Sequence, residues 1–358
     1  MPRRSATILA STILLIALFC AGVFIRVPYS EMSPGPTYNT LGDQSGKPVI
    51  TISGRTTYPT TGNLNMTTVE VTSADYELNL VEAVTGWLRH DAAVIPHANL
   101  YPDNQTEQQA EQQNAEDFTA SQDSAKAAAL KELDIPVGTE VVVSAVVADS
   151  PSVGKLHAGD VIVAVDGTKV TDPDQVATLV TKHQPGQDVV FTVLPPGKDG
   201  KNGTTGGASQ QVTVTTAKNP DTGKAMVGIQ PGTEHTFPFS IDINLGDVGG
   251  PSAGLMFSLG IVDKLRPTDL TGGKFVAGTG TIDDNGKVGP IGGISMKVIA
   301  ARRAGATYFF TPSDNCAEAA SGTPAGLRLI KVDTLAQAVN DLADIRSGNL
   351  AALPSCSK

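Results

Sequence analysis

The chain is poor in the residues on which cross-linked or metal-bound small folds depend. Its 358 residues include three cysteines and five histidines. Three cysteines cannot hold together a disulfide-dense scaffold, and neither a Cys-x-x-Cys nor a His-Glu-x-x-His motif occurs in the sequence. Zinc ribbons and zinc proteases of these types are therefore excluded. We expect no metal and no cofactor.

Basic residues are also in the minority. The sequence has 26 Lys and Arg against 36 Asp and Glu, which gives a net charge of −10. Proteins that bind nucleic acid need a basic surface to neutralise phosphates, so we expect no nucleic-acid partner. Hydrophobic residues make up 40% of the chain and charged residues 17%, a composition that can bury a core rather than remain disordered. The length predicts two to three domains.

Charged residues are absent from residues 6–25, ATILASTILLIALFCAGVFI. As a helix this segment would be about 30 Å long, enough to cross the hydrocarbon core of a membrane. The basic excess lies before the segment, in Arg3 and Arg4. Because the side richer in Lys and Arg stays in the cytoplasm, the pattern predicts a cytoplasmic tail at 1–5 and sends the rest of the chain out of the cytoplasm.

A cleaved signal peptide is the alternative to a membrane anchor. The apolar run is longer than the usual signal, and no small-x-small cleavage site follows it. Leu18 and Phe19 before Cys20 are too bulky for a lipoprotein site. The sequence favours an uncleaved, single-pass anchor in the cell membrane. Export would leave Cys316 and Cys356 in an oxidising compartment, where they either pair or remain two free thiols.

Residues 26–125 combine a predicted linker with strand-like and helical patterns. The parts are a juxtamembrane linker at 27–46, strands within 48–72, a helix at 78–89, and a polar stretch at 102–125 that leads into a run of helix formers. We expect the material at 48–95 to pack onto the C-terminal domain. The domain between them would then be an insertion.

Residues 126–218 predict a compact, strand-rich domain. Asp166 and Gly167 give a hairpin signal, Asp172 is a candidate helix N-cap, and the glycines between 197 and 207 predict a flexible loop. The run S-P-(x)3-K-L-x-A-G-D-V-I-V-A-V-D-G, which starts at Ser150, resembles the core of PDZ domains. The resemblance implies a PDZ fold for this part of the chain.

PDZ domains bind extended peptides by adding a strand to an exposed sheet edge. The resemblance implies that Val137, Gly138, Thr139 and Glu140 correspond to the segment whose amides hold a peptide carboxylate. Thr139 and Glu140 depart from the usual apolar and glycine pattern at this place. The alternative is a packing or gating module with a covered groove, and the sequence leaves both open.

The stretch from Gly246 to Leu265 is the strongest candidate for chemistry. Gly249, Gly250 and Pro251 predict a tight loop, after which Ser252 would open a helix. Free amides at the start of a helix can stabilise a developing oxyanion. The simpler alternative is that Ser252 is only an N-cap, a position at which serine is common.

Histidine is absent after Ser252, and this absence narrows the mechanism. Residues 250–254 fit the G-x-S-x-G motif of α/β-hydrolases, whose catalytic histidine follows the serine in the chain. All five histidines here precede Ser252, the last being His235, so that motif does not apply. A trypsin-like PDZ protease is also excluded, because its catalytic domain precedes the PDZ domain and no GDSGGP-like serine motif occurs here.

Lys297 is the candidate base. It follows the glycine-rich turn at 289–293 and has Met296, Val298 and further apolar residues beside it. Burial among such neighbours would lower the pKa of the amine, which could then accept the proton of the serine hydroxyl. The alternative is an ordinary lysine that extends from an amphipathic helix into solvent.

Two motifs together resemble the proteolytic domain of Lon proteases, which use a Ser-Lys dyad. They are GGPSAG and AGTGTIDDNGKVGPIGGISMK, within residues 228–345. The resemblance implies that Ser252 is the nucleophile, Lys297 the general base and Thr279 the residue that orients the lysine. From the free amides at the helix start, we expect those of Ser252 and Ala253 to form the oxyanion hole. The chain departs from the family at the position three before the serine, which is Gly249 rather than an acidic residue. Asp247 is therefore a doubtful substitute.

The order of anchor, PDZ domain and Lon-type domain resembles bacterial membrane-anchored PDZ/Lon-type serine peptidases. No G-x-x-x-x-G-K-[ST] motif for ATP occurs. The resemblance implies an α+β fold, a short tail at 346–358, and an ATP-independent endopeptidase that cleaves protein or peptide substrates outside the cytoplasm. A hexameric homo-oligomer is implied by resemblance alone. The alternatives are a catalytically silent PDZ adaptor and a protein that processes only itself.

Overall fold

The computed structural model describes residues 3–102, 105–195, 208–246 and 248–356. Two compact units share the chain. Unit 1 comprises Met1–Asp134 together with Phe239–Lys358, and unit 2 comprises Ile135–Pro238. The chain therefore leaves unit 1, builds unit 2, and returns to unit 1.

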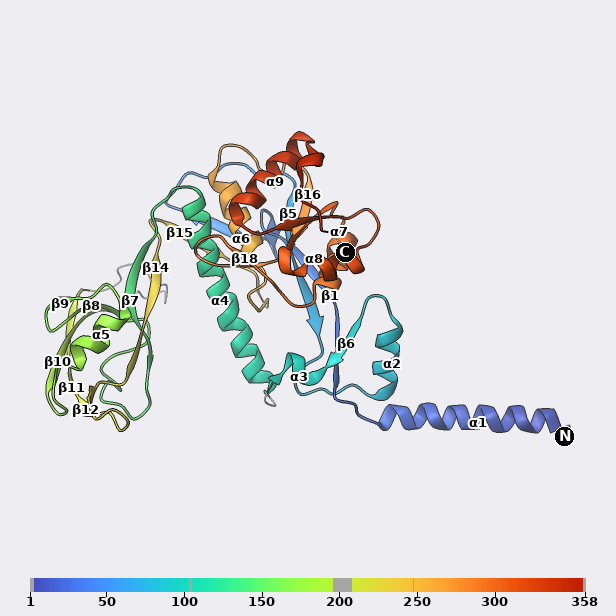
Figure 1. Ribbon diagram of the computed structural model, residues 1–358, viewed down its shortest axis with the longest axis horizontal. Helices are drawn as coiled ribbons and strands as arrows, with labels where there is room; N and C mark the ends of the chain where they lie inside the picture. Colours follow the sequence, from blue (N-terminus) through green and yellow to red (C-terminus); the bar gives the residue numbers. More distant parts are fainter. Residues whose placement is uncertain (1–2, 103–104, 196–207, 247, 357–358) are drawn as a thin grey trace. The chain divides into compact units, whose positions relative to one another are not determined.

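Unit 1 contains a mixed sheet with helices on both faces (Figure 1). Its N-terminal part contains α1 Arg3–Phe24, β1 Tyr29–Asn39, β2 Asp43–Gln44, β3 Lys47–Pro48, β4 Ile50–Ser53, β5 Asn63–Val71, α2 Leu80–Leu88, β6 Ala93–Pro96, α3 His97–Leu100 and α4 Glu107–Glu132. Its C-terminal part contains β15 Ser240–Ile243, α6 Gly254–Leu265, β16 Phe275–Gly278, β17 Thr281–Ile282, β18 Val288–Gly289, α7 Ile294–Ala304, β19 Tyr308–Pro312, η2 Ser313–Asn315, α8 Cys316–Ser321, β20 Arg328–Val332, α9 Leu335–Ser347 and η3 Leu350–Ala352.

The main sheet of unit 1 has the strand order β20-β19-β16-β5-β1-β6. Strands β5, β16, β19 and β20 pair in parallel, whereas β1 is antiparallel to both β5 and β6. Strands from 48–95 and from the C-terminal part thus form one sheet. The helix α7 packs on the face that carries Ala277 and Phe309. The helix α6 lies on the other face, where a Cβ at Gly278 would meet Met256 at 2.7 Å.

Strand β1 corrects the prediction of a linker at 27–46. The proline and glycine content of this segment is typical of linkers, but its alternate side chains, Ser30 and Met32, are buried in unit 1. The register of pairing with β5 shifts between Pro34 and Thr37. Proline is tolerated at such irregularities because no ladder hydrogen bond from its nitrogen is needed there.

Helix α1 runs almost directly into this sheet. Its residues Thr7–Phe24 have a mean hydropathy of 2.4 with 6% buried, so the helix is long and apolar enough to cross a membrane. A signal sequence would meet the same criterion. The backbone just after α1 is tied to the segment before α2, because Val27 N donates to Leu78 O at 2.9 Å and Leu80 N donates to Ile25 O at 2.9 Å.

Helix α4 unites the polar stretch with the following helix formers in one element. Thr106 and Gln109 form a capping box at its start, which satisfies backbone donors that the helix leaves free. The helix packs along α6, with Phe118 and Phe257 in edge-to-face contact at 5.7 Å between ring centroids. A segment that is polar and rich in glutamine thus continues into the core of unit 1.

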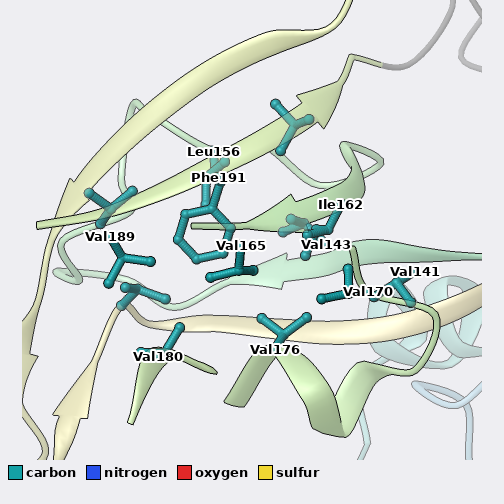
Figure 2. Close-up of a cluster of buried hydrophobic side chains, with 13 residues drawn as sticks. Val141, Val143, Leu156, Ile162, Val165, Val170, Val176, Val180, Val189 and Phe191 are labelled. Atoms are coloured by element: carbon teal, nitrogen blue, oxygen red, sulfur yellow. The ribbon is translucent and has the colours of Figure 1, made fainter. Parts of the chain in front are cut away.

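Unit 2 is built of short strands around one small helix. Its elements are β7 Gly138–Val146, β8 Val161–Val165, β9 Thr168–Lys169, α5 Pro173–Val180, β10 Asp188–Leu194, β11 Gln210–Thr215, β12 Ala217–Lys218, β13 Ala225–Met226 and β14 Ile229–Thr236. The sheet order is β11-β10-β8-β7-β14. Valines dominate its core, with Phe191 and Leu156 among them (Figure 2).

The structure of unit 2 confirms two local predictions. Asp166 and Gly167 both have positive φ, 49° and 72°, as a tight hairpin requires, and Asp172 caps α5 by accepting from Asp174 N. The bounds differ from the predicted 126–218. Residues 126–132 are the last turns of α4, and β14 belongs to unit 2. The predicted glycine loop at 197–207 lies outside the described residues.

Cys316 and Cys356 form a disulfide bond. The sequence left open whether they pair, and in the structure the bond ties the start of α8 to the segment that follows η3. Cys20 is a free cysteine on α1.

Candidate active site

The side chains of Ser252, Thr279 and Lys297 come from separate parts of unit 1 and lie close together. Lys297, in the first turn of α7, places its Nζ 2.6 Å from Ser252 Oγ and 3.1 Å from Thr279 Oγ1. Thr279 directly follows β16 and donates from Oγ1 to the carbonyl oxygen of Ser252 at 2.9 Å. The fold therefore brings together the residues that the sequence proposed as nucleophile, base and orienting hydroxyl.

Ser252 is not the cap of the helix that follows it. Helix α6 begins at Gly254 with Ala253 at the N-cap position, so Ser252 lies in the turn before the helix. A Cβ at Gly254 would lie 2.8 Å from Ile282 Cγ2, and only glycine allows this close approach. The serine hydroxyl forms a hydrogen bond with Lys297 instead of capping the helix.

Lys297 is buried rather than extended into solvent. Only 2% of the residue is exposed, and this burial lowers the pKa of its amine to about 7. No described acidic residue forms an ion pair with it, so no partner charge restores the ammonium form. At neutral pH a large share of the amine is unprotonated and able to accept a proton.

The turn before α7 fixes the place of the lysine. Gly293, at the N-cap, has a φ of 68°, a left-handed conformation that a residue with a side chain rarely adopts. A Cβ there would also lie 2.5 Å from Met32 Sδ on β1. The glycine lets α7 start against the sheet, with Lys297 on the first turn.

Thr279 links the backbone carbonyl of Ser252 to the amine of Lys297 through two hydrogen bonds. Its hydroxyl hydrogen is directed at the carbonyl of Ser252, which also accepts from Gly280 N at 2.9 Å. The oxygen of Thr279 is then left to accept from Lys297 Nζ. Lys297 Nζ also lies within hydrogen-bond distance of Ser252 Oγ, so a neutral amine that donates to Thr279 can direct its lone pair at the serine hydroxyl.

The N-terminus of α6 can hold a negative charge. Among the described residues, the backbone N–H groups of Ser252 and Ala253 have no acceptor. Free amides at a helix start, together with the helix dipole, favour an anion. Asp247, the doubtful acidic residue upstream, lies outside the described residues. The described residues contain no group of three or more His, Cys, Asp or Glu able to hold a metal ion.

Helix α4 supports the turn that carries Ser252, and the sequence reasoning missed this role. Gly250 N donates to Asn114 O at 2.8 Å, and Ser121 Oγ donates to Pro251 O at 2.9 Å. Both contacts come from the glutamine-rich stretch. The available signal was the unbroken run of helix formers without proline between 107 and 132.

The residues predicted to bind peptides lie on an edge that is already paired. Gly138, Thr139 and Glu140 begin β7, and Val137 immediately precedes it. The whole of this edge pairs antiparallel with β14, in a register that places Thr139 opposite His235. Strand β14 also contacts α5. The chain thus adds one of its own strands where a peptide would be expected to add one.

Two family models match the chain. The model of the PDZ domain matches residues 111–205, and the model of the Lon protease (S16) C-terminal proteolytic domain matches residues 224–344. The chain combines a PDZ domain with a Lon-type proteolytic domain. Ser252, Thr279 and Lys297 all lie within the Lon-type domain, and this match supports a serine peptidase.

Curated relatives of the Lon-type domain are Lon proteases. One from Azospirillum brasilense is 40% identical over 89 residues, which are 24% of this chain and 11% of the relative. One from Chloroflexus aggregans is 33% identical over 146 residues, 39% of this chain and 18% of the relative. Lon protease 2 of Bacillus subtilis is 34% identical over 112 residues, 29% and 19%. The chain spans less than a fifth of each.

Solved structures of PDZ domains resemble part of the chain. The PDZ domain of the SdrC-like protein Lin2157 from Listeria innocua is 22% identical, with a TM-score of 0.21, over 25% of this chain and 90% of that one. The PDZ domain of the SdrC-like protein Lmo2051 from Listeria monocytogenes is 23% identical, with a TM-score of 0.22, over 26% and 86%.

Proposed function

We propose that the protein is an ATP-independent, membrane-anchored serine endopeptidase that cleaves protein substrates outside the cytoplasm by a Ser252–Lys297 dyad. The observation that carries the proposal is the 2.6 Å approach of a buried lysine amine to the serine hydroxyl. The lowered pKa of Lys297, about 7, fits a base that works near neutral pH.

The proposed reaction proceeds in two steps. Lys297 Nζ accepts the hydroxyl proton while Ser252 Oγ attacks the scissile carbonyl carbon, and the amides of Ser252 and Ala253 stabilise the oxyanion. The ammonium then returns the proton to the leaving amine, which leaves an acyl-enzyme. Water, activated by the same amine, releases the acyl group. Thr279 keeps the lone pair of Lys297 directed at Ser252 through both steps.

Anchoring and topology are proposed from α1. A helix whose residues Thr7–Phe24 are almost fully exposed and apolar is unfavourable in water. Arg3 and Arg4 at its start favour a cytoplasmic N-terminus. The disulfide between Cys316 and Cys356 supports an oxidising location for the catalytic unit.

The proposed test measures cleavage by the purified full-length chain in detergent. An unfolded protein such as casein is the substrate, and the Ser252→Ala and Lys297→Ala variants are the controls. We expect cleavage by the wild type without ATP, no gain when ATP is added, and loss in both variants. Cleavage that persists unchanged in both variants would remove the dyad assignment.

The same assay separates the two alternative functions. A self-processing protein would lose its own intact band, in a manner dependent on Ser252, while casein stays whole. A PDZ adaptor would cleave neither but would bind peptides with a free C-terminus. The pairing of β7 with β14 argues for a gating role of the PDZ domain, because a peptide could add to β7 only after β14 leaves.

A further inference from the structure

Helix α2 turns its apolar side to the outside of unit 1. Four large apolar residues recur at spacings of four, three and one along one side of the helix and are exposed: Leu80 40%, Val84 47%, Trp87 77% and Leu88 68%. The opposite side faces the protein, where Gly86 is buried against Glu31 and Val94. A surface helix normally buries its apolar side, so this face implies a partner.

The position of α2 indicates what that partner is. Val81 Cγ2 lies 3.1 Å from the place of a Cβ on Gly22 of α1, and Leu80 N bonds Ile25 O. Gly22 lies two residues before the end of α1, which is about 3 Å along a helix axis. Helix α2 therefore meets α1 where the candidate membrane span ends.

We propose that α2 lies in the outer interface of the same bilayer that α1 crosses, with Leu80, Val84, Trp87 and Leu88 inserted at the boundary between headgroups and acyl chains. The inference rests on the proposed membrane anchoring. Continuity with α1 favours lipid as the occupant, because the lipid surface is the medium next to this end of the span. Tryptophan is enriched at this depth of membranes, and amphipathic helices bind there through their apolar face.

The interfacial helix would hold the catalytic unit in a defined pose on the membrane. Arg89, at the end of α2, pairs with Glu31 at 3.2 Å and with Asp91 at 3.0 Å. Asp91 also pairs with Arg303 of α7 at 2.8 Å, and α7 carries Lys297. The membrane contact and the catalytic helix are therefore joined by direct ion pairs within unit 1.

Trp87 is the only tryptophan of the chain, so its fluorescence reports on α2 alone. The full-length protein is reconstituted into phosphatidylcholine vesicles, with and without lipids brominated at acyl carbons near the headgroup. We expect the brominated lipids to remove about half of the Trp87 emission or more, since the side chain would lie at their depth. A matched control carries Trp87→Phe with Tyr58→Trp, and we expect its tryptophan emission to be the same with and without the brominated lipids.

Extraction with alkaline carbonate separates failure of this inference from failure of the anchor. Full-length protein that stays in the vesicles while Trp87 is unquenched, with the emission of a water-exposed tryptophan, would overturn the lipid contact and leave the anchor intact. Trp87 emission that indicates shielding from water but is not quenched by the brominated lipids, and that changes with protein density in the vesicle, would assign the face to a second copy of the chain. This outcome would also overturn the lipid contact. Protein released by carbonate would refute the anchor itself.

Discussion

The serine turn of unit 1 and the β7 edge of unit 2 both resemble functional motifs, but the fold completes them differently. Around Ser252, a lysine and a threonine from two other elements converge, and both are buried although no described acidic residue pairs with the lysine. Along β7, the backbone groups that could bind a peptide are already paired with β14. The difference shows that a burial cost such as that of Lys297 is stronger evidence for chemistry than a strand edge is for binding.

The largest expected effect is the loss of peptide cleavage when Lys297 is replaced by Met. The substitution keeps the length and apolar stem of the side chain and removes the base, so we expect peptide cleavage to fall by about 10³-fold or more. Circular dichroism melts serve as the control for folding.

The same variant should unfold at a higher temperature. The pKa of Lys297 is about 7 in the folded state against 10.5 for a free lysine. The unfolded state therefore binds more protons between pH 7 and 10.5, and the folded state bears the full cost of the amine below pH 7. Removing it should gain on the order of 4 kcal/mol at pH 7 and less near pH 10. A less stable Met variant would contradict the buried, unpaired state of the amine.

The next prediction concerns the edge of β7 in unit 2, which pairs with β14. If β14 must leave before a peptide binds, the apparent affinity is reduced by the fraction of molecules in which it has left. For peptides with a free C-terminus, we expect the dissociation constant of the wild type to be about 100-fold higher than that of a PDZ domain whose groove is open. A disulfide between cysteines at the paired positions 139 and 235 should abolish binding, and its reduction should restore it. Equal binding in the locked and reduced forms would show that peptides use another surface.

A smaller effect is expected for Thr279→Val. Valine keeps the shape of threonine but cannot accept from Lys297 or donate to the carbonyl of Ser252. We expect kcat to fall by about 10- to 100-fold while KM changes little, because the role proposed for Thr279 is to orient the base rather than the substrate. Thr279→Ser should recover most of the rate. A purely structural role would lower the melting temperature of the Val variant without this rescue.

The smallest effect is expected at the support of the serine turn. Ser121→Ala removes one hydrogen bond to Pro251 O, worth about 1 kcal/mol, so we expect roughly a fivefold loss of kcat. Ser124→Ala, also on α4, is a matched control that should leave the rate unchanged. A loss in both variants would point to the stability of α4 rather than to the turn.

The local parts of the fold were predictable, while the long-range ones were not. The hairpin at Asp166 and the cap at Asp172 depend on residues next to each other in the chain, and both predictions were confirmed. The strand at 29–39 and the α4 contacts to Gly250 and Pro251 depend on packing between distant segments. Composition pointed to a linker at 27–46 and only to a polar stretch at 102–125, because it records local preference and not the partner that buries a segment.

The candidate site divides in the same way. The absence of histidine after Ser252 narrowed the base to a lysine, and the setting of Lys297 predicted its burial. Nothing in the spacing of residues could show that β14 would cover the edge of β7, since that pairing joins segments about 90 residues apart.

The pH dependence of Ser252 acylation tests the central claim most directly. A fluorophosphonate reacts with the serine only when the base is free, so its rate of labelling should rise about tenfold per pH unit below the pKa of Lys297 and level off above about 7. The Lys297→Met variant should lose this pH-dependent labelling altogether. A profile that is flat from pH 5 to about 9, or that is the same in the Met variant, would contradict Lys297 as the base.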